Sequence, residues 1–129
     1  MSISFIALLG VVACNGLSDN QVVGRYSLVS VDAKENTTLS YQLEDGNYVG
    51  VVDKVVFAIG FDDSYIIAKQ HPSNNRGVAN YYIVPVYKKP TLSPEKGVIG
   101  PLTADQFMVK RKELGISEKL TFTKVIEDL

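Results

Sequence analysis

Two apolar runs that flank a short acidic turn constrain the fold of this chain more than any other feature. Residues 54–60 (KVVFAIG) and 64–70 (SYIIAKQ) are rich in the β-branched and aromatic residues that favour strands. Phe61-Asp62-Asp63 separates them and is typical of a turn. The segment therefore predicts an antiparallel hairpin. The first run is apolar at successive positions, so we expect it in the centre of a sheet with both faces covered.

Further strands are predicted on both sides of this hairpin. Residues 37–43 alternate apolar and polar side chains, which is typical of a half-buried strand. Pro85 has no amide donor, so it predicts a sheet edge or a bulge in its strand. Residues 88–100 are rich in proline and glycine and predict a long loop. The other expected strands are residues 22–32, 48–52, 80–87 and 120–125.

One α-helix is predicted near residues 104–114. Thr103 is a good N-cap residue, and Gln106 follows three positions later to complete a capping box. Gly115 suits the position just after a helix. We expect Phe107 on the helix face that packs against the sheet.

These elements together indicate an α+β fold. We expect six or seven short strands in a mostly antiparallel β-sheet and one C-terminal helix. Strands and helices do not alternate along the chain, which argues against a parallel, doubly wound sheet. A chain of 129 residues is the usual length of one domain, which we place at residues 22–129.

The amino-terminal stretch differs in composition from the rest of the chain. Residues 3–13 are apolar or small, and no charged side chain precedes Asp19. The run is shorter than the roughly 20 apolar residues that span a bilayer, and it has the length of the apolar core of a secretory signal peptide. We therefore expect residues 1–13 to be a signal peptide. The alternative is a buried amino-terminal strand that carries a core cysteine.

The end of this stretch resembles the lipobox of bacterial lipoproteins. Val11-Val12-Ala13-Cys14 is an aliphatic run that ends in a small residue before the only cysteine of the chain. The resemblance implies cleavage before Cys14, diacylglycerol attachment to its sulfur, and anchoring in the cell membrane or outer membrane with the domain outside the cytoplasm. The polar residues of 14–21 then form a flexible tether.

The balance of charge argues against nucleic acid as a partner. The chain has 13 Lys and Arg residues, 14 Asp and Glu residues, and a net charge of −1. The main basic cluster is Lys110-Arg111-Lys112, which we expect to lie on a solvated helix face. One cysteine is too few for an internal disulfide or a zinc site of cysteine ligands.

The sequence predicts no catalytic residue, no cofactor site and no metal site. The only histidine, His71, lies in a segment of loop composition near Ser73, and we expect it to be a solvated loop residue. No G-x-S-x-G motif supports a serine hydrolase. The acidic pair Asp62-Asp63 is typical of a turn, and it has no EF-hand pattern around it.

Two consecutive tyrosines are candidate contacts for a partner. Tyr81 and Tyr82 lie in an expected strand and should point to opposite faces of the sheet. If one face is open, an exposed tyrosine there suits contact with a protein or glycan. The alternative is that both faces of the strand are covered.

Three segments carry a second family resemblance. KVVFAIGFDDSYIIAKQ, NYYIV and GPLTADQFMVKRKELGI, in this order, resemble a family of small bacterial proteins known only as a domain of unknown function. Many members of that family begin with a lipobox. The resemblance covers roughly residues 22–125 and implies an address and a fold rather than functional residues.

These features favour a lipid-anchored, non-enzymatic protein of the cell envelope that binds another envelope component or has a structural role. One alternative is an immunity protein or inhibitor that acts against a secreted toxin or a lysozyme-like enzyme. Another is an envelope hydrolase that uses His71.

Overall fold

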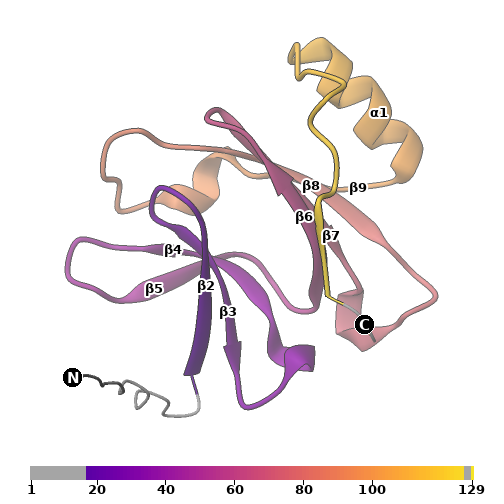
Figure 1. Cartoon of the computed structure of the whole chain (residues 1–129). Helices are drawn as coiled ribbons and strands as arrows, with labels where there is room; N and C mark the ends of the chain where they lie inside the picture. Colours follow the sequence, from indigo (N-terminus) through magenta and orange to yellow (C-terminus); the bar gives the residue numbers. More distant parts are fainter. Residues whose placement is uncertain (1–16, 127–128) are drawn as a thin grey trace, which may run out of the picture.

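A computed structural model describes residues 17–126 and 129, and within them the chain forms three layers (Figure 1). A four-stranded sheet packs on a five-stranded sheet, and one α-helix covers the other face of the five-stranded sheet. The expected signal peptide, residues 1–13, and Cys14 lie outside the described residues. The described ranges contain no helix that is long and apolar enough to cross a membrane.

The first sheet is a run of antiparallel hairpins in chain order. Its strands are β2 (Leu17–Val23), β3 (Tyr26–Val31), β4 (Thr38–Gln42) and β5 (Tyr48–Val52). Short turns connect them because Gly24 and Gly46 adopt φ angles of 56° and 93°, which glycine accepts without a steric penalty. A 3-10 turn at Lys34–Asn36 joins β3 to β4.

The second sheet has the order β10-β6-β7-β8-β9, and every pair in it is antiparallel. The predicted hairpin forms its centre, with Asp62 accepting hydrogen bonds from two backbone amides of the turn at 2.8 Å each. Two more 3-10 turns, Pro72–Asn74 and Pro94–Gly97, lie in its connections. The strands are β6 (Val56–Phe61), β7 (Tyr65–Gln70), β8 (Asn80–Pro85), β9 (Ile99–Leu102) and β10 (Lys124–Val125).

The central strands contribute side chains to two separate cores. Ile66 and Val84 are fully buried between the two sheets, whereas their neighbours Ile67 and Ile83 are fully buried beneath the helix layer. Successive residues of a strand point to opposite faces, so a strand covered on both sides must be apolar at consecutive positions. The expectation that 54–60 lies in the centre of a sheet is therefore confirmed for the part that forms β6.

Helix α1 (Ala104–Glu113) lies over β8 and β9. Its capping box is present as predicted: the Gln106 amide donates to the Thr103 hydroxyl at 3.1 Å, and the Gln106 side chain accepts from the Thr103 amide at 2.9 Å. Phe107 is 2% exposed and anchors the helix on the sheet. The α+β class with a mostly antiparallel sheet and a C-terminal helix is confirmed.

The number of strands differs from the expectation. The described ranges contain nine strands rather than six or seven. The expected single strand at 22–32 is two strands, because Gly24 and the following residue form a turn. Residues 17–21 of the expected tether lie in β2 and pair with β3, so these residues are part of the first sheet.

The positions of three other strands also differ from the expectation. β8 lies between β7 and β9 and is not a sheet edge, and Pro85 is its last residue, where no bond to β9 is needed. The irregularity of this strand occurs earlier, between Tyr81 and Ile83. β9 begins inside the expected loop 88–100, and the last strand is confined to Lys124–Val125.

Candidate functional site

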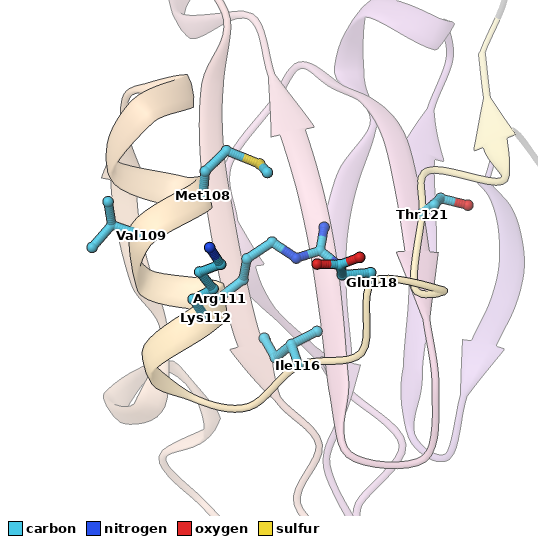
Figure 2. Close-up of a pocket in the computed structure, with 7 residues that line it drawn as sticks. All are labelled: Met108, Val109, Arg111, Lys112, Ile116, Glu118 and Thr121. Carbon is cyan, nitrogen blue, oxygen red and sulfur yellow. The ribbon is translucent and has the colours of Figure 1, made fainter.

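A pocket opens between α1 and the chain segment that follows it (Figure 2). Its volume is about 570 Å³, within the range of roughly 300–1,000 Å³ that is typical of small-molecule sites. Most of its surface is apolar. Two helix turns supply one wall and the loop before β10 supplies the other; the lining residues are Met108, Val109, Arg111, Lys112, Ile116, Glu118 and Thr121.

Arg111 is the buried cation of this pocket. Only 9% of its surface is exposed, and one guanidinium nitrogen, Nη2, donates to the carbonyl oxygens of Ser117 at 2.7 Å and Leu120 at 2.6 Å. Its Cζ lies 5.4 Å from the ring centre of Phe107. These contacts hold the loop after α1 against the helix. The expectation that Lys110-Arg111-Lys112 forms a solvated face is wrong for the middle residue, because the helix places it on the same side as Phe107.

The remaining donors of Arg111 have no protein acceptor in the described ranges. A guanidinium carries five N–H groups, and the two hydrogen bonds above use Nη2 alone. Arg111 forms no ion pair with any side chain among residues 20–126 and 129. Figure 2 shows its side chain reaching from α1 towards the segment that carries Glu118. A buried cation without an ion-pair partner is costly, and an anion in the pocket would relieve that cost.

Two exposed apolar side chains continue the pocket onto the helix surface. Met108 and Val109 are 57% and 58% exposed. Both line the pocket, together with the buried Ile116. The exposed face of α1 is therefore not uniformly polar, and Met108 lies on the side of the helix that carries Arg111 (Figure 2).

A second, smaller hollow of about 280 Å³ lies on the four-stranded sheet. It is lined by polar residues near the turn between β2 and β3, among them Gln21, Ser27 and Gln42. Arg25 borders it and is already engaged, since its Nη1 donates to the carbonyl oxygen of Gln42 at 3.1 Å. This hollow therefore lacks the unpaired cation that distinguishes the pocket at α1.

His71 is buried, which corrects the expectation of a solvated loop histidine. It is 6% exposed, and its ring stacks on Phe57 with a centroid distance of 3.8 Å and an interplanar angle of 5°. Its Nδ1 lies 2.8 Å from the carbonyl oxygen of Val78. Since a carbonyl oxygen only accepts, Nδ1 carries the proton. The ring is enclosed by structural contacts, and among the described residues no carboxylate pairs with it to form a catalytic dyad.

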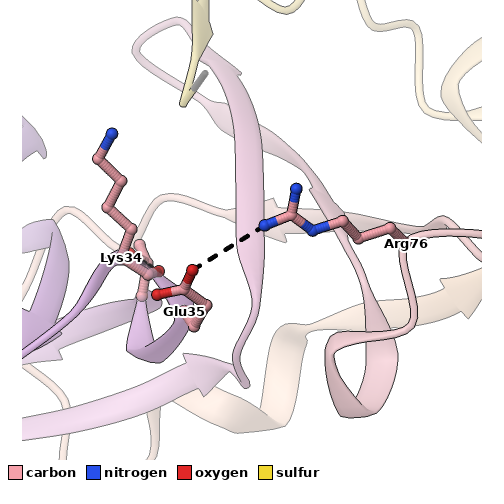
Figure 3. A network of polar contacts seen from close by, with 4 residues as sticks. Lys34, Glu35 and Arg76 are labelled. Atoms are coloured by element: carbon pink, nitrogen blue, oxygen red, sulfur yellow. Dashed lines mark hydrogen bonds and ion pairs between the residues drawn. The ribbon is translucent and has the colours of Figure 1, made fainter. Parts of the chain in front are cut away.

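The loop after His71 contacts the other sheet through one exposed ion pair. Arg76 lies 3.9 Å from the Glu35 carboxylate, and the side chain of Lys34, on the same 3-10 turn, extends away from that carboxylate (Figure 3). Both partners of the pair are about half exposed, so it contributes at most about 1 kcal/mol to stability. The contact joins two loops and does not involve the side chain of His71.

The acidic residues serve as turn formers. Asp62 accepts from the amides of Ser64 and Tyr65, and Asp45 accepts from the amide of Asn47 at 2.9 Å. Such bonds are the usual role of aspartate in turns. Within the described part of the chain, no group of three or more His, Cys, Asp or Glu residues is arranged to hold a metal ion.

Tyr81 and Tyr82 point to opposite faces of β8, and both faces are covered. The Tyr81 ring lies 5.0 Å from that of Phe107 in the helix layer. Tyr82 packs on the core between the sheets, and its hydroxyl donates to the Gln70 side chain at 3.2 Å. Both side chains are half-buried. Their role as partner contacts stays a prediction.

Sequence reasoning missed Arg111 as the residue around which the pocket is built. Three consecutive basic residues indicate solvent exposure, so the sequence did not predict that the guanidinium of the middle residue, Arg111, is buried. The available clue was the spacing of four residues from Phe107, which puts both side chains on one helix face. The return of the loop at residues 117–120 over this face depends on tertiary structure.

The comparison with known families covers most of the described residues. DUF3997, a protein family of unknown function, matches residues 23–126. The chain belongs to this family. No curated protein and no solved structure matches the chain. The match includes β3 to β10, α1 and all seven residues that line the pocket.

Proposed function

We propose that this member of DUF3997 is a non-enzymatic binding module of the cell envelope, held at a membrane by lipid on Cys14. The single observation that supports a binding role best is the pocket at α1, where a buried guanidinium with free donors meets an apolar wall. Convergence of a few polar groups in a mostly apolar pocket is the usual form of a ligand site.

The position of the pocket suits a protein that is anchored near its amino terminus. Leu17, the first residue of β2, follows Cys14 by three positions, which span at most about 11 Å. α1 is separated from the four-stranded sheet by the whole five-stranded sheet (Figure 1). A lipid at Cys14 would thus hold the β2 side near the bilayer and leave the pocket on the side that faces away.

Intact mass measurement tests the anchor. Protein taken from membranes of the native host should have the mass of residues 14–129 plus a diacylglycerol group. Cys14→Ala, and separately the signal peptidase inhibitor globomycin, should leave the amino-terminal segment uncleaved. Full-length, unmodified protein in the soluble fraction would overturn the proposed location.

A further inference from the structure

The unused donors of Arg111 indicate which ligand the pocket takes. We propose that it binds an amphipathic monocarboxylate, with the carboxylate on the Arg111 guanidinium and an aliphatic group against Met108, Val109 and Ile116. This inference specifies the ligand class of the proposed binding function and rests on it. It does not depend on the lipid at Cys14.

The charge of the ligand follows from the pocket lining. Arg111 and Lys112 are positive and Glu118 is negative, so the lining carries one net positive charge. Nε and Nη1 of Arg111 have no acceptor among the described residues, and a planar carboxylate matches the fork of a guanidinium. Burial to 9% exposure strengthens the attraction relative to that of a surface arginine.

The apolar side chains that line the pocket indicate that the ligand carries an apolar group. Met108 and Val109 are more than half exposed, Ile116 is buried, and all three line the pocket. Covering such side chains stabilises a complex by roughly 25 cal/mol per Å² of apolar surface removed from water. A small inorganic anion would leave these walls wet, whereas an aliphatic chain would cover them.

Calorimetric titration of the full-length protein tests the ligand class. Decanoate, used below its micelle concentration, should bind with 1:1 stoichiometry and at least about tenfold more tightly than decanol, as the loss of a charge-assisted hydrogen bond predicts. Decylammonium should not bind. A carboxylate with an aliphatic group can come from a peptide carboxyl terminus or from a free acyl chain. N-acetyl-leucine, with its amide as the uncharged control, represents the peptide terminus. Tighter binding of N-acetyl-leucine than of decanoate identifies a peptide carboxyl terminus, and tighter binding of decanoate identifies a free acyl chain.

Variants on the pocket rim separate ligand binding from folding. Arg111→Ala also removes two bonds to the loop, so loss of binding there can reflect unfolding. Met108→Glu instead adds a carboxylate at an exposed helix position, four residues before Lys112, where the fold tolerates it. It should weaken decanoate binding at least about tenfold through like-charge repulsion. Leu92→Glu is the matched control, because Leu92 is 85% exposed and lies outside the pocket.

Glu118→Gln should act in the opposite direction. The Glu118 side chain lies on the pocket wall opposite α1 (Figure 2), and removing its charge should tighten decanoate binding by about two- to fivefold. Equal affinity for decanoate and decanol, no saturable binding, or unchanged binding in Met108→Glu would each overturn the ligand class. These results leave the lipid anchor unaffected, because intact mass reports on Cys14 alone.

Discussion

The hydroxyl of Tyr26 donates a hydrogen bond to the carbonyl oxygen of Pro85 at 3.0 Å, across 59 positions of the sequence. Tyr26 is fully buried in the core between the sheets, with its ring 5.1 Å from that of Tyr41 in an edge-to-face arrangement. The amide of Tyr87 donates to the same hydroxyl at 3.4 Å. One side chain of the first sheet thus satisfies two backbone groups at the end of β8.

Tyr26→Phe should lower the free energy of unfolding by about 1–2 kcal/mol, because it leaves the part-buried Pro85 carbonyl and Tyr87 amide without their shared partner. Urea unfolding followed by circular dichroism measures the change. The control is Tyr65→Phe: Tyr65 is half-buried, and its hydroxyl makes no hydrogen bond within residues 20–126 and 129. Equal destabilisation by the two variants would contradict the role of the Tyr26 hydroxyl.

Alkaline pH should destabilise the fold through two tyrosines. Burial raises the pKa of Tyr26. Burial is also the main cause that raises the pKa of Tyr82, and the nearby negative charge of Asp53 adds a smaller increase. Above pH about 10 the unfolded chain loses these protons while the folded chain keeps them, so the free energy of unfolding falls as pH rises.

The double variant Tyr26→Phe, Tyr82→Phe isolates this effect. Its free energy of unfolding should depend less on pH between about 9 and 11 than that of the wild type. Urea titrations at both pH values measure the slope. An unchanged slope would show that other groups govern alkaline unfolding.

Gly60 and Gly50 are strand glycines at which substitution by alanine should have different effects on the free energy of unfolding. A Cβ on Gly60 would lie 1.9 Å from the carbonyl oxygen of Thr121, where the segment before β10 crosses β6. Gly60→Ala should therefore cost about 1–3 kcal/mol or displace that segment. Gly50→Ala meets no atom within 4 Å and should change stability by less than about 1 kcal/mol. Thermal unfolding of both variants decides the comparison.

Thr103→Ala should lower the free energy of unfolding by about 1 kcal/mol, because it removes the hydroxyl that accepts from the Gln106 amide. The helix anchors the outer layer, so amide exchange should quicken first in residues 104–107. Thr123→Ala is the control, since Thr123 is exposed and bonds through its backbone. Equal exchange in both variants would argue against a role for the cap.

Local rules predicted the parts of the fold that depend on neighbouring residues. The strand at β4, the turn at Asp62 and the Thr103 cap each follow from a few adjacent side chains, and each is present. The half-buried pattern expected for β4 is not found, because Ser40 on its polar face is 4% exposed. The turn at Gly24 was missed because VVGRY reads as one apolar strand when its partners are unknown. β9 was missed because the prolines and glycines of residues 88–100 indicate a loop, although Pro101 and Gly100 fit an edge strand that pairs on one side only.

The pocket and the buried histidine could not be predicted from composition. His71 lies in a segment of serine, asparagine and glycine, yet Phe57 from β6 and the Val78 carbonyl enclose its ring. Arg111 lies in a basic run, yet the loop at Ser117 closes over it. In both cases the burial comes from elements that a reading of the local sequence does not bring together.

The two covered faces of the five-stranded sheet restrict how this family can diversify. Ile66 and Ile67 are adjacent in sequence but belong to different cores, so neither face of β7 is available to another molecule. Under the proposed binding function, substitutions that change the choice of ligand are therefore expected only on the outer layers and the sheet edges. Packing on both faces constrains the five-stranded sheet in the middle of the molecule. Differences in ligand specificity between relatives should therefore be concentrated around α1 and on the outer surface of the four-stranded sheet.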